Sequence, residues 1–103
     1  MTTRPVYSFR VLVTTDNRSG DVLAVNLRIR KGRSVETKEF GDGAAFADYD
    51  KKGELLNIEV LGPCEVKILD SIAASDVTTR KFIRDSLPSK MLLGKGKGKG
   101  LLV

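Results

Sequence analysis

The clearest alternation of apolar and polar positions lies in residues 44–61, and it predicts a β-hairpin. Side chains alternate with a period of two on both sides of residues 50–53, and the second half carries the apolar set Leu56, Ile58 and Val60. Period-two alternation around a Gly-containing turn is a hairpin signal. Asp50 can accept hydrogen bonds from the turn backbone, and Gly53 can adopt positive φ. One face of this hairpin is apolar, so the rest of the chain must cover it.

Three further segments have strand patterns, at residues 6–14, 21–31 and 34–40. The first places Tyr7, Phe9, Val11 and Val13 on one side, and the second has the cleanest apolar face, formed by Leu23, Val25, Leu27 and Ile29. The third is polar and charged, which is typical of a sheet edge. Short turns between successive strands favour an antiparallel meander.

Residues 64–74 allow two interpretations. Val66, Leu69 and Ile72 recur at helical spacing, whereas Cys64, Val66 and Ile68 alternate as in a strand. We favour a helix, because its pattern runs longer and Pro63 suits a first helical turn.

A second helix is predicted at residues 77–86. Ser75 or Asp76 would cap it, and its inner stripe would be Val77, Phe82 and Ile83. The predicted fold class is therefore α+β, an antiparallel β-meander of four to five strands with one or two C-terminal helices on one face. We expect a single domain at residues 1–88 and a flexible basic tail at 89–103, since alternating Lys and Gly can neither bury a core nor hold a helix.

The net charge of +5 is concentrated near the C-terminal end. Residues 1–79 sum to −1 and residues 80–103 to +6. The candidate phosphate contacts are Arg80, Lys81, Arg84, Lys90, Lys95, Lys97 and Lys99. Phe82 is the only aromatic residue among them and is expected to face inward, so binding would involve no base stacking and would ignore sequence. A membrane-surface role is not expected, because the tail is too short and too Gly-rich for an amphipathic helix.

The chain has few groups suited to catalysis. It contains no histidine, which excludes His-based triads and most zinc sites. Its single cysteine, Cys64, excludes an intrachain disulfide and is expected to be an unreactive thiol. The hairpin carboxylates Asp42, Asp48, Asp50 and Glu54 could hold a metal, although carboxylates in turns are more often structural. We expect no enzyme activity, cofactor or metal, and a cytoplasmic location, since the N-terminus has no secretory signal pattern.

Three short motifs follow one another between residues 16 and 61. They are Asp21-Val22-Leu23-Ala24-Val25, then Val35-Glu36-Thr37-Lys38-Glu39, then Asp48-Tyr49-Asp50 with Gly53, Leu55 and Ile58-Glu59-Val60-Leu61. Together they resemble a small bacterial family with no assigned function, whose pattern ends in Asp-Tyr-Asp-x-x-Gly-x-Leu-x-x-Ile-Glu-x-Leu. The family's Tyr-Asp opening is Thr15-Asp16 here, and its Leu-Tyr-Ile tyrosine is Ala24. The resemblance implies a small α+β fold and, for some members, an antitoxin-like role.

Three functions remain open from the sequence. The first is a non-catalytic module that binds an unknown protein partner, such as a toxin. The second is a nucleic-acid accessory that holds phosphates through the basic C-terminal segment, and the third is an enzyme that uses the hairpin carboxylates with a metal. A homodimer could form through the edge at residues 6–14 or 34–40, although charges argue against the second edge.

Overall fold

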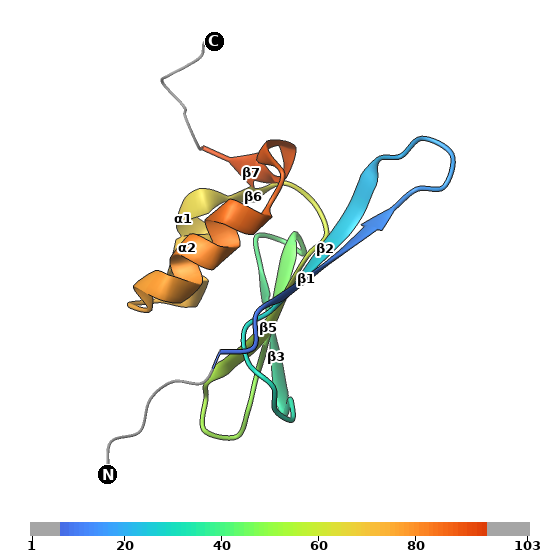
Figure 1. Cartoon of the computed structure of the whole chain (residues 1–103). Helices are drawn as coiled ribbons and strands as arrows, with labels where there is room; N and C mark the ends of the chain where they lie inside the picture. Colours follow the sequence, from blue (N-terminus) through green and yellow to red (C-terminus); the bar gives the residue numbers. More distant parts are fainter. Residues whose placement is uncertain (1–6, 95–103) are drawn as a thin grey trace.

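The computed structural model describes residues 7–94, which form a sheet covered on one face by two helices (Figure 1). The sheet is antiparallel with strand order β1-β2-β5-β4-β3. Its strands are β1 (Arg10–Thr15), β2 (Val22–Arg28), β3 (Glu36–Phe40), β4 (Ala45–Tyr49) and β5 (Leu55–Val60). The helices are α1 (Val66–Ala73) and α2 (Val77–Ser86). The predicted α+β class, with five antiparallel strands and two helices, is confirmed.

The β4–β5 hairpin forms where the alternating pattern predicted it. Its strands pair from Ala45 opposite Val60 to Tyr49 opposite Leu55. In the turn, the Asp50 carboxylate accepts hydrogen bonds from the backbone of residues 52 and 54, at 2.8 and 2.9 Å. Gly53 has a φ of 83°, which only glycine adopts without strain. The turn chemistry is therefore as the sequence predicts.

The order of the strands departs from chain order at one place. β3, β4 and β5 form a meander, but β2 pairs with β5, and β3 lies at the far edge (Figure 1). This pairing places Val25 opposite Val60 and Leu27 opposite Ile58, in the middle of the sheet. The charged strand β3 is left at the edge, where its side chains stay in water.

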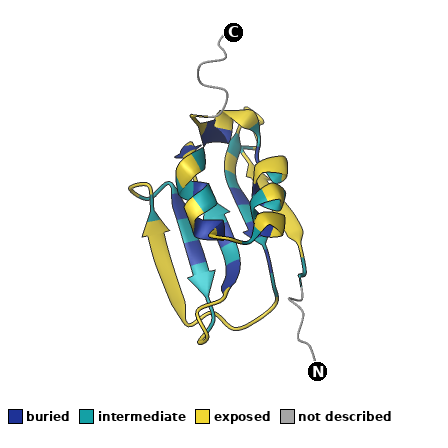
Figure 2. Ribbon diagram, turned by 90° about the vertical axis from the view of Figure 1, so that its left-hand side faces the viewer, coloured by how far each residue is buried: buried dark blue, intermediate teal, exposed yellow. Residues whose placement is uncertain are grey.

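The core lies between the sheet and the two helices (Figure 2). The sheet contributes Val25, Leu27, Ile29, Ala45, Ala47, Ile58 and Val60, each with no exposed surface. The helices contribute Leu69 and Ile72 from α1 and Ile83 from α2. Burying each large aliphatic side chain stabilises the fold by about 1.5–3 kcal/mol, so the helices stay on this face.

The two interpretations of residues 64–74 each describe part of the segment. Residues Cys64–Glu65 form the short strand β6, and α1 begins at Val66. β6 pairs in parallel with β7 (Leu92–Leu93). Helical spacing then places Leu69 and Ile72 against the core.

The prediction that Val77 belongs to the buried stripe of α2 is wrong. Val77 is 67% exposed, because the buried stripe of α2 is Thr79 and Ile83, continued by Leu87 just beyond the helix. Those residues recur every four positions, whereas Val77 is two positions from Thr79, on roughly the opposite side of the helix. Asp76 caps the helix, with its side chain accepting a hydrogen bond from the Thr79 backbone.

The folded part of the chain extends past residue 88, so a flexible tail does not begin at residue 89. Ser89–Met91 form a 3₁₀ turn, η1, and Leu92–Leu93 form β7. Met91 and Leu92 are buried, at 4% and 7% exposed. Apolar side chains before the Lys-Gly repeat therefore complete the core. Lys95, Lys97 and Lys99 lie outside the described residues.

The N-terminal strand is displaced from its predicted bounds. We expected residues 6–14, but the ladder of β1 runs over Arg10–Thr15, and Val6 is not among the described residues. Before the ladder, Tyr7 and Phe9 stack with ring centroids 4.8 Å apart, and Phe9 stacks on Phe82 of α2 at 4.2 Å. The Ser8 N–H still donates to the Ile29 carbonyl at 2.8 Å, so this segment stays beside the end of β2 while its rings pack toward the helix. Neither helix of residues 7–94 has the length and apolar character to cross a membrane.

Candidate interaction site

The basic residues expected to hold phosphate do not form a free cluster. On α2, Arg84 Nε donates to Asp70 Oδ1 at 3.2 Å, and the hydrogen bond and charge of Asp70 raise the pKa of Arg84. Lys81 Nζ lies 3.0 Å from Asp85 Oδ2, and Arg80 Nη2 donates to the Ala74 carbonyl at 2.7 Å. These three cations therefore already have partners within the fold. Lys90 is exposed in η1, apart from the α2 set.

The single thiol and the hairpin carboxylates are held in structural positions. Cys64 is 2% exposed, and its burial, together with the charge of Glu65, raises its pKa. A raised pKa keeps the thiol protonated at neutral pH, which fits the expectation of an unreactive group.

The four hairpin carboxylates have separate surroundings. Asp48 Oδ1 accepts from Thr37 Oγ1 at 2.6 Å, and Asp50 holds its own turn. Asp42 and Glu54 are exposed. Among residues 7–94, no group of three or more His, Cys, Asp or Glu side chains is placed to hold a metal ion. The structure therefore does not assemble the carboxylates into one site.

The strongest surface feature is the free edge of β1. Within residues 7–94, β1 pairs only with β2, and all six of its residues are exposed. Val11 and Val13 lie opposite Leu27 and Val25, on the face that the helices cover elsewhere. They remain 41% and 45% exposed, and Leu12, on the other face, is 64% exposed. Both faces of this edge are thus apolar at the centre of the strand.

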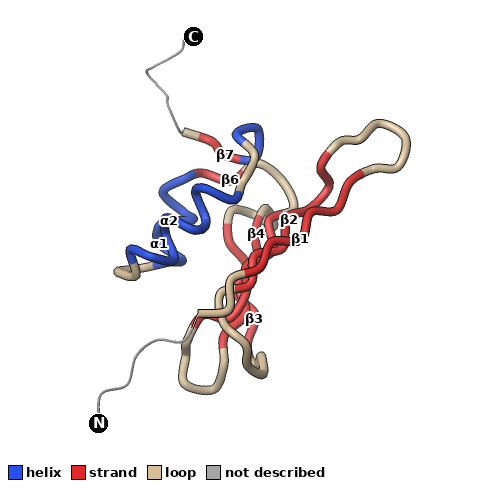
Figure 3. The backbone as a smooth tube through the Cα atoms, in the orientation of Figure 1, coloured by secondary structure: helices blue, strands red, loops and turns tan. Residues whose placement is uncertain are grey.

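β1 and β2 extend beyond the rest of the sheet as a two-stranded ribbon, residues 10–28. β2 pairs with β5 only from Val25 to Arg28, so in the described part of the chain no third strand lies beside residues 14–24 (Figure 3). Leu23 belongs to the predicted apolar face of β2 but is 50% exposed, because it lies in this part of the ribbon. The ribbon therefore carries apolar surface that the described part of the chain leaves uncovered.

The ribbon has an ordered tip. Asp16 Oδ1 accepts hydrogen bonds from the backbone N–H of Arg18 at 2.8 Å and of Ser19 at 2.9 Å. These bonds lower the pKa of Asp16, and Gly20 supplies a φ of 76°. A carboxylate that bonds forward along the chain and a glycine at positive φ make a defined turn.

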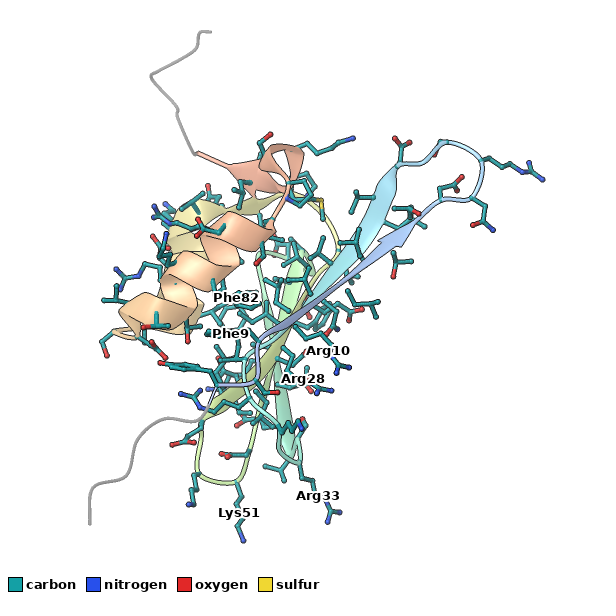
Figure 4. The ribbon with its side chains drawn as sticks, in the orientation of Figure 1. Phe9, Arg10, Arg28, Arg33, Lys51 and Phe82 are labelled. Atoms are coloured by element: carbon teal, nitrogen blue, oxygen red, sulfur yellow. The ribbon has the colours of Figure 1, made fainter. Side chains whose placement is uncertain are left out.

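The base of the ribbon is joined to α2 by a polar network. The Tyr7 hydroxyl donates to Asp76 at 2.9 Å, and Arg30 Nη2 lies 3.8 Å from Asp76 Oδ2. The Arg30 guanidinium also lies over the Tyr7 ring, 5.1 Å from its centroid. With the Phe9–Phe82 stack, these contacts fix the edge strand relative to the helices (Figure 4).

The sequence predicted the two sheet edges but not how much apolar surface β1 exposes. The alternating apolar residues at positions 7–13 would look the same in a covered strand, so the local sequence does not distinguish an exposed edge from a covered one. The exposure follows from where the helices end and where β5 stops pairing with β2, which are long-range properties.

Comparison with protein-family models, with curated proteins and with solved structures gives no significant match. The resemblance to the small bacterial family therefore stays a prediction.

Proposed function

We propose that this chain is a non-catalytic, cytoplasmic protein-interaction module that binds an extended segment of a partner protein along the edge of β1. The observation that carries the proposal is the free, apolar β1 edge, with Val11, Leu12 and Val13 all more than two-fifths exposed. Unpaired strand edges bind extended peptides through main-chain hydrogen bonds.

The chemistry of the edge supports an apolar partner segment. Side chains of an added strand would alternate between the two faces of the sheet. Those on the helix side would contact Val11 and Val13, and those on the other side would contact Leu12. The opposite edge of the sheet, β3, carries Glu36, Lys38 and Glu39, which discourage such pairing.

The fixed position of β1 also supports the proposal. The stack of Phe9 on Phe82 and the bond from Tyr7 to Asp76 hold the start of the strand before any partner arrives. A pre-ordered edge loses less conformational entropy on binding than a flexible one. The resemblance to a family with antitoxin-like members makes a toxin protein the first partner class to test, and the free thiol of Cys64 suits a reducing compartment.

The test is affinity capture from native extract with three forms of the chain. We expect the wild type to retain a stoichiometric partner and Val13→Lys to lose it, because a charge on the edge strand opposes strand addition. Val77→Lys is the matched control, since Val77 is 67% exposed on α2. Hydrogen exchange on the captured complex should show new protection of the β1 amides.

Two outcomes would contradict the proposal. One is a partner that Val13→Lys retains as well as the wild type does. The other is a concentration-dependent dimer that Val13→Lys dissociates. In that case a second copy of the chain, and not a partner protein, would occupy the β1 edge. Light scattering of the purified chain distinguishes the two.

The alternative function, a nucleic-acid accessory acting through the basic C-terminal segment, receives less support. Arg80, Lys81 and Arg84 are bound within the fold, and a phosphate would have to displace those contacts.

A further inference from the structure

The uncovered face of the sheet has a row of polar side chains that crosses all five strands. The strand registers place Arg10 opposite Arg28, Arg28 opposite Asn57, Asn57 opposite Asp48, and Asp48 opposite Thr37. Residues directly opposite one another in a sheet point to the same face. Arg10 and Arg28 lie together on the side away from the helices (Figure 4).

The arginine pair is an unfavourable arrangement in the free protein. Like charges directly opposite on neighbouring strands destabilise a sheet. Within residues 7–94, neither Arg10 nor Arg28 forms a salt bridge, whereas Arg30 and Arg84 each have an aspartate. The described part of the fold therefore provides these two guanidinium groups with no anion of their own.

A hollow of about 420 Å³ opens beside Arg28, and Arg10 is not among the residues that line it. Its lining includes Arg28, Arg30, Lys31, Ser34, Asn57 and Asp48. Arg30 is already used by Asp76, so Arg28 and Lys31 are the cations left for a ligand. Among the described residues that line the hollow, Asp48 is the one carboxylate, and its two oxygens accept from Thr37 at 2.6 Å and from Asn57 at 3.5 Å.

We propose that this hollow binds a phosphate group, with Arg28 as its principal ligand and Lys31 and Ser34 at its rim. An arginine fork matches phosphate oxygens with two parallel hydrogen bonds, and a bound dianion would neutralise the opposed pair. Arg33 and Lys51, two loop cations at the end of the sheet, point away from it into solvent (Figure 4). The site is therefore compact, which suits a small phosphorylated molecule better than an extended backbone.

The proposal goes beyond the interaction function, since the hollow is lined by β2, the loop after it, β4 and β5, and by no residue of the β1 edge. Val13→Lys should leave phosphate binding intact, and Arg28→Gln should leave partner capture intact. Failure of one proposal is thereby distinguishable from failure of the other.

The first experiment titrates the full chain with inorganic pyrophosphate at low salt and follows the backbone amides by NMR. We expect shifts that saturate and that centre on residues 28, 31, 34 and 57. Arg28→Gln should weaken binding by about tenfold or more, since it removes a charge-assisted contact. Arg84→Gln is the matched control and should change the Kd by less than about twofold, because its charge is bound to Asp70.

A second measurement does not depend on knowing the ligand. Without phosphate, Arg28→Gln should raise the Tm, because it removes the repulsion with Arg10. Pyrophosphate should raise the Tm of the wild type and leave that of Arg28→Gln nearly unchanged.

A parallel titration with a single-stranded oligonucleotide distinguishes the source of the phosphate. Oligonucleotide binding that requires Arg28, without pyrophosphate binding, would mean that the bound phosphates belong to a nucleic-acid backbone. The proposal is overturned if neither probe shifts the residues around Arg28 at about 10 mM, or if Arg84→Gln weakens binding as much as Arg28→Gln.

Discussion

Replacing Asp76 with alanine should produce a large loss of stability for a single polar side chain. Asp76 caps α2 through the backbone N–H of Thr79 at 3.1 Å and accepts from the Thr79 hydroxyl at 2.7 Å. It also accepts from the Tyr7 hydroxyl at 2.9 Å and pairs with Arg30. One carboxylate thus joins the N-terminal segment, the loop that follows β2 and the start of α2.

The magnitude follows from three losses. Removing a helix cap costs about 1 kcal/mol. Thr79 is only 1% exposed, so its hydroxyl would be buried without its acceptor, which costs about 1–3 kcal/mol. The partly exposed ion pair with Arg30 adds at most about 1 kcal/mol. We expect Asp76→Ala to lower the free energy of unfolding by about 2–5 kcal/mol.

Urea unfolding measures this loss as a shift in the midpoint at constant slope. Asp85→Ala is the control, because Asp85 pairs with Lys81 on the exposed face of the same helix, and it should cost no more than about 0.5 kcal/mol. Asp76→Asn should be intermediate, since asparagine also caps helices. A loss for Asp76→Ala no larger than that for Asp85→Ala would refute the reasoning.

The same residue gives the stability a pH dependence. Burial by itself would raise the pKa of Asp76, but the hydrogen bonds from Thr79 and Tyr7 and the charge of Arg30 outweigh it and lower the pKa. The stabilisation is therefore complete above the unfolded-state pKa of about 3.9 and is lost as the pH falls through the folded-state pKa. The difference in stability between wild type and Asp76→Asn should shrink across that acidic window.

Other substitutions test the backbone and the C-terminal boundary. Ala74 has φ of 56° and ψ of −128°, a strained conformation for alanine, so Ala74→Gly should raise the free energy of unfolding by about 1 kcal/mol. Gly53 has a φ of 83° in an open turn, so Gly53→Ala should lower it by about 1–2 kcal/mol in the same urea assay. Met91 is 4% exposed, so Met91→Ala should cost about 2–5 kcal/mol, whereas an unaltered midpoint would mean that residues 89–93 do not belong to the fold.

Local sequence patterns predicted the elements that depend on residues close together in the chain. The β4–β5 hairpin, its Asp50 turn and the Asp76 cap each depend on residues within a few positions of one another, so the sequence was sufficient. The stripe of α2 was misjudged at Val77, because three residues over about two turns cannot fix the direction in which a helix faces. The segment 89–93 was missed because the Lys-Gly repeat dominated the interpretation of the short apolar run before it.

The candidate sites could be predicted from the sequence only in part, because they depend on strand pairing and register. The edge at residues 6–14 was predicted, but its exposure depends on which strand pairs with β2. The opposition of Arg10 and Arg28 requires the register of β1 on β2, and the hollow requires β5 beside both. In contrast, the basic residues of α2 were visible in the sequence, whereas the Ala74 carbonyl that binds Arg80 and the Asp70 carboxylate that binds Arg84 follow from the packing of the helices.

The strand order also bears on how the chain folds. The β1–β2 and β4–β5 hairpins each close over a short turn, so both can form early and independently. The central pairing of β2 with β5 joins residues far apart in the chain. The chain must therefore lose the conformational entropy of the intervening loop before this contact stabilises it. We therefore expect docking of the two preformed hairpins to be the slow step. Until it is complete, the apolar faces of both hairpins are open to water, and folding competes with aggregation at that stage.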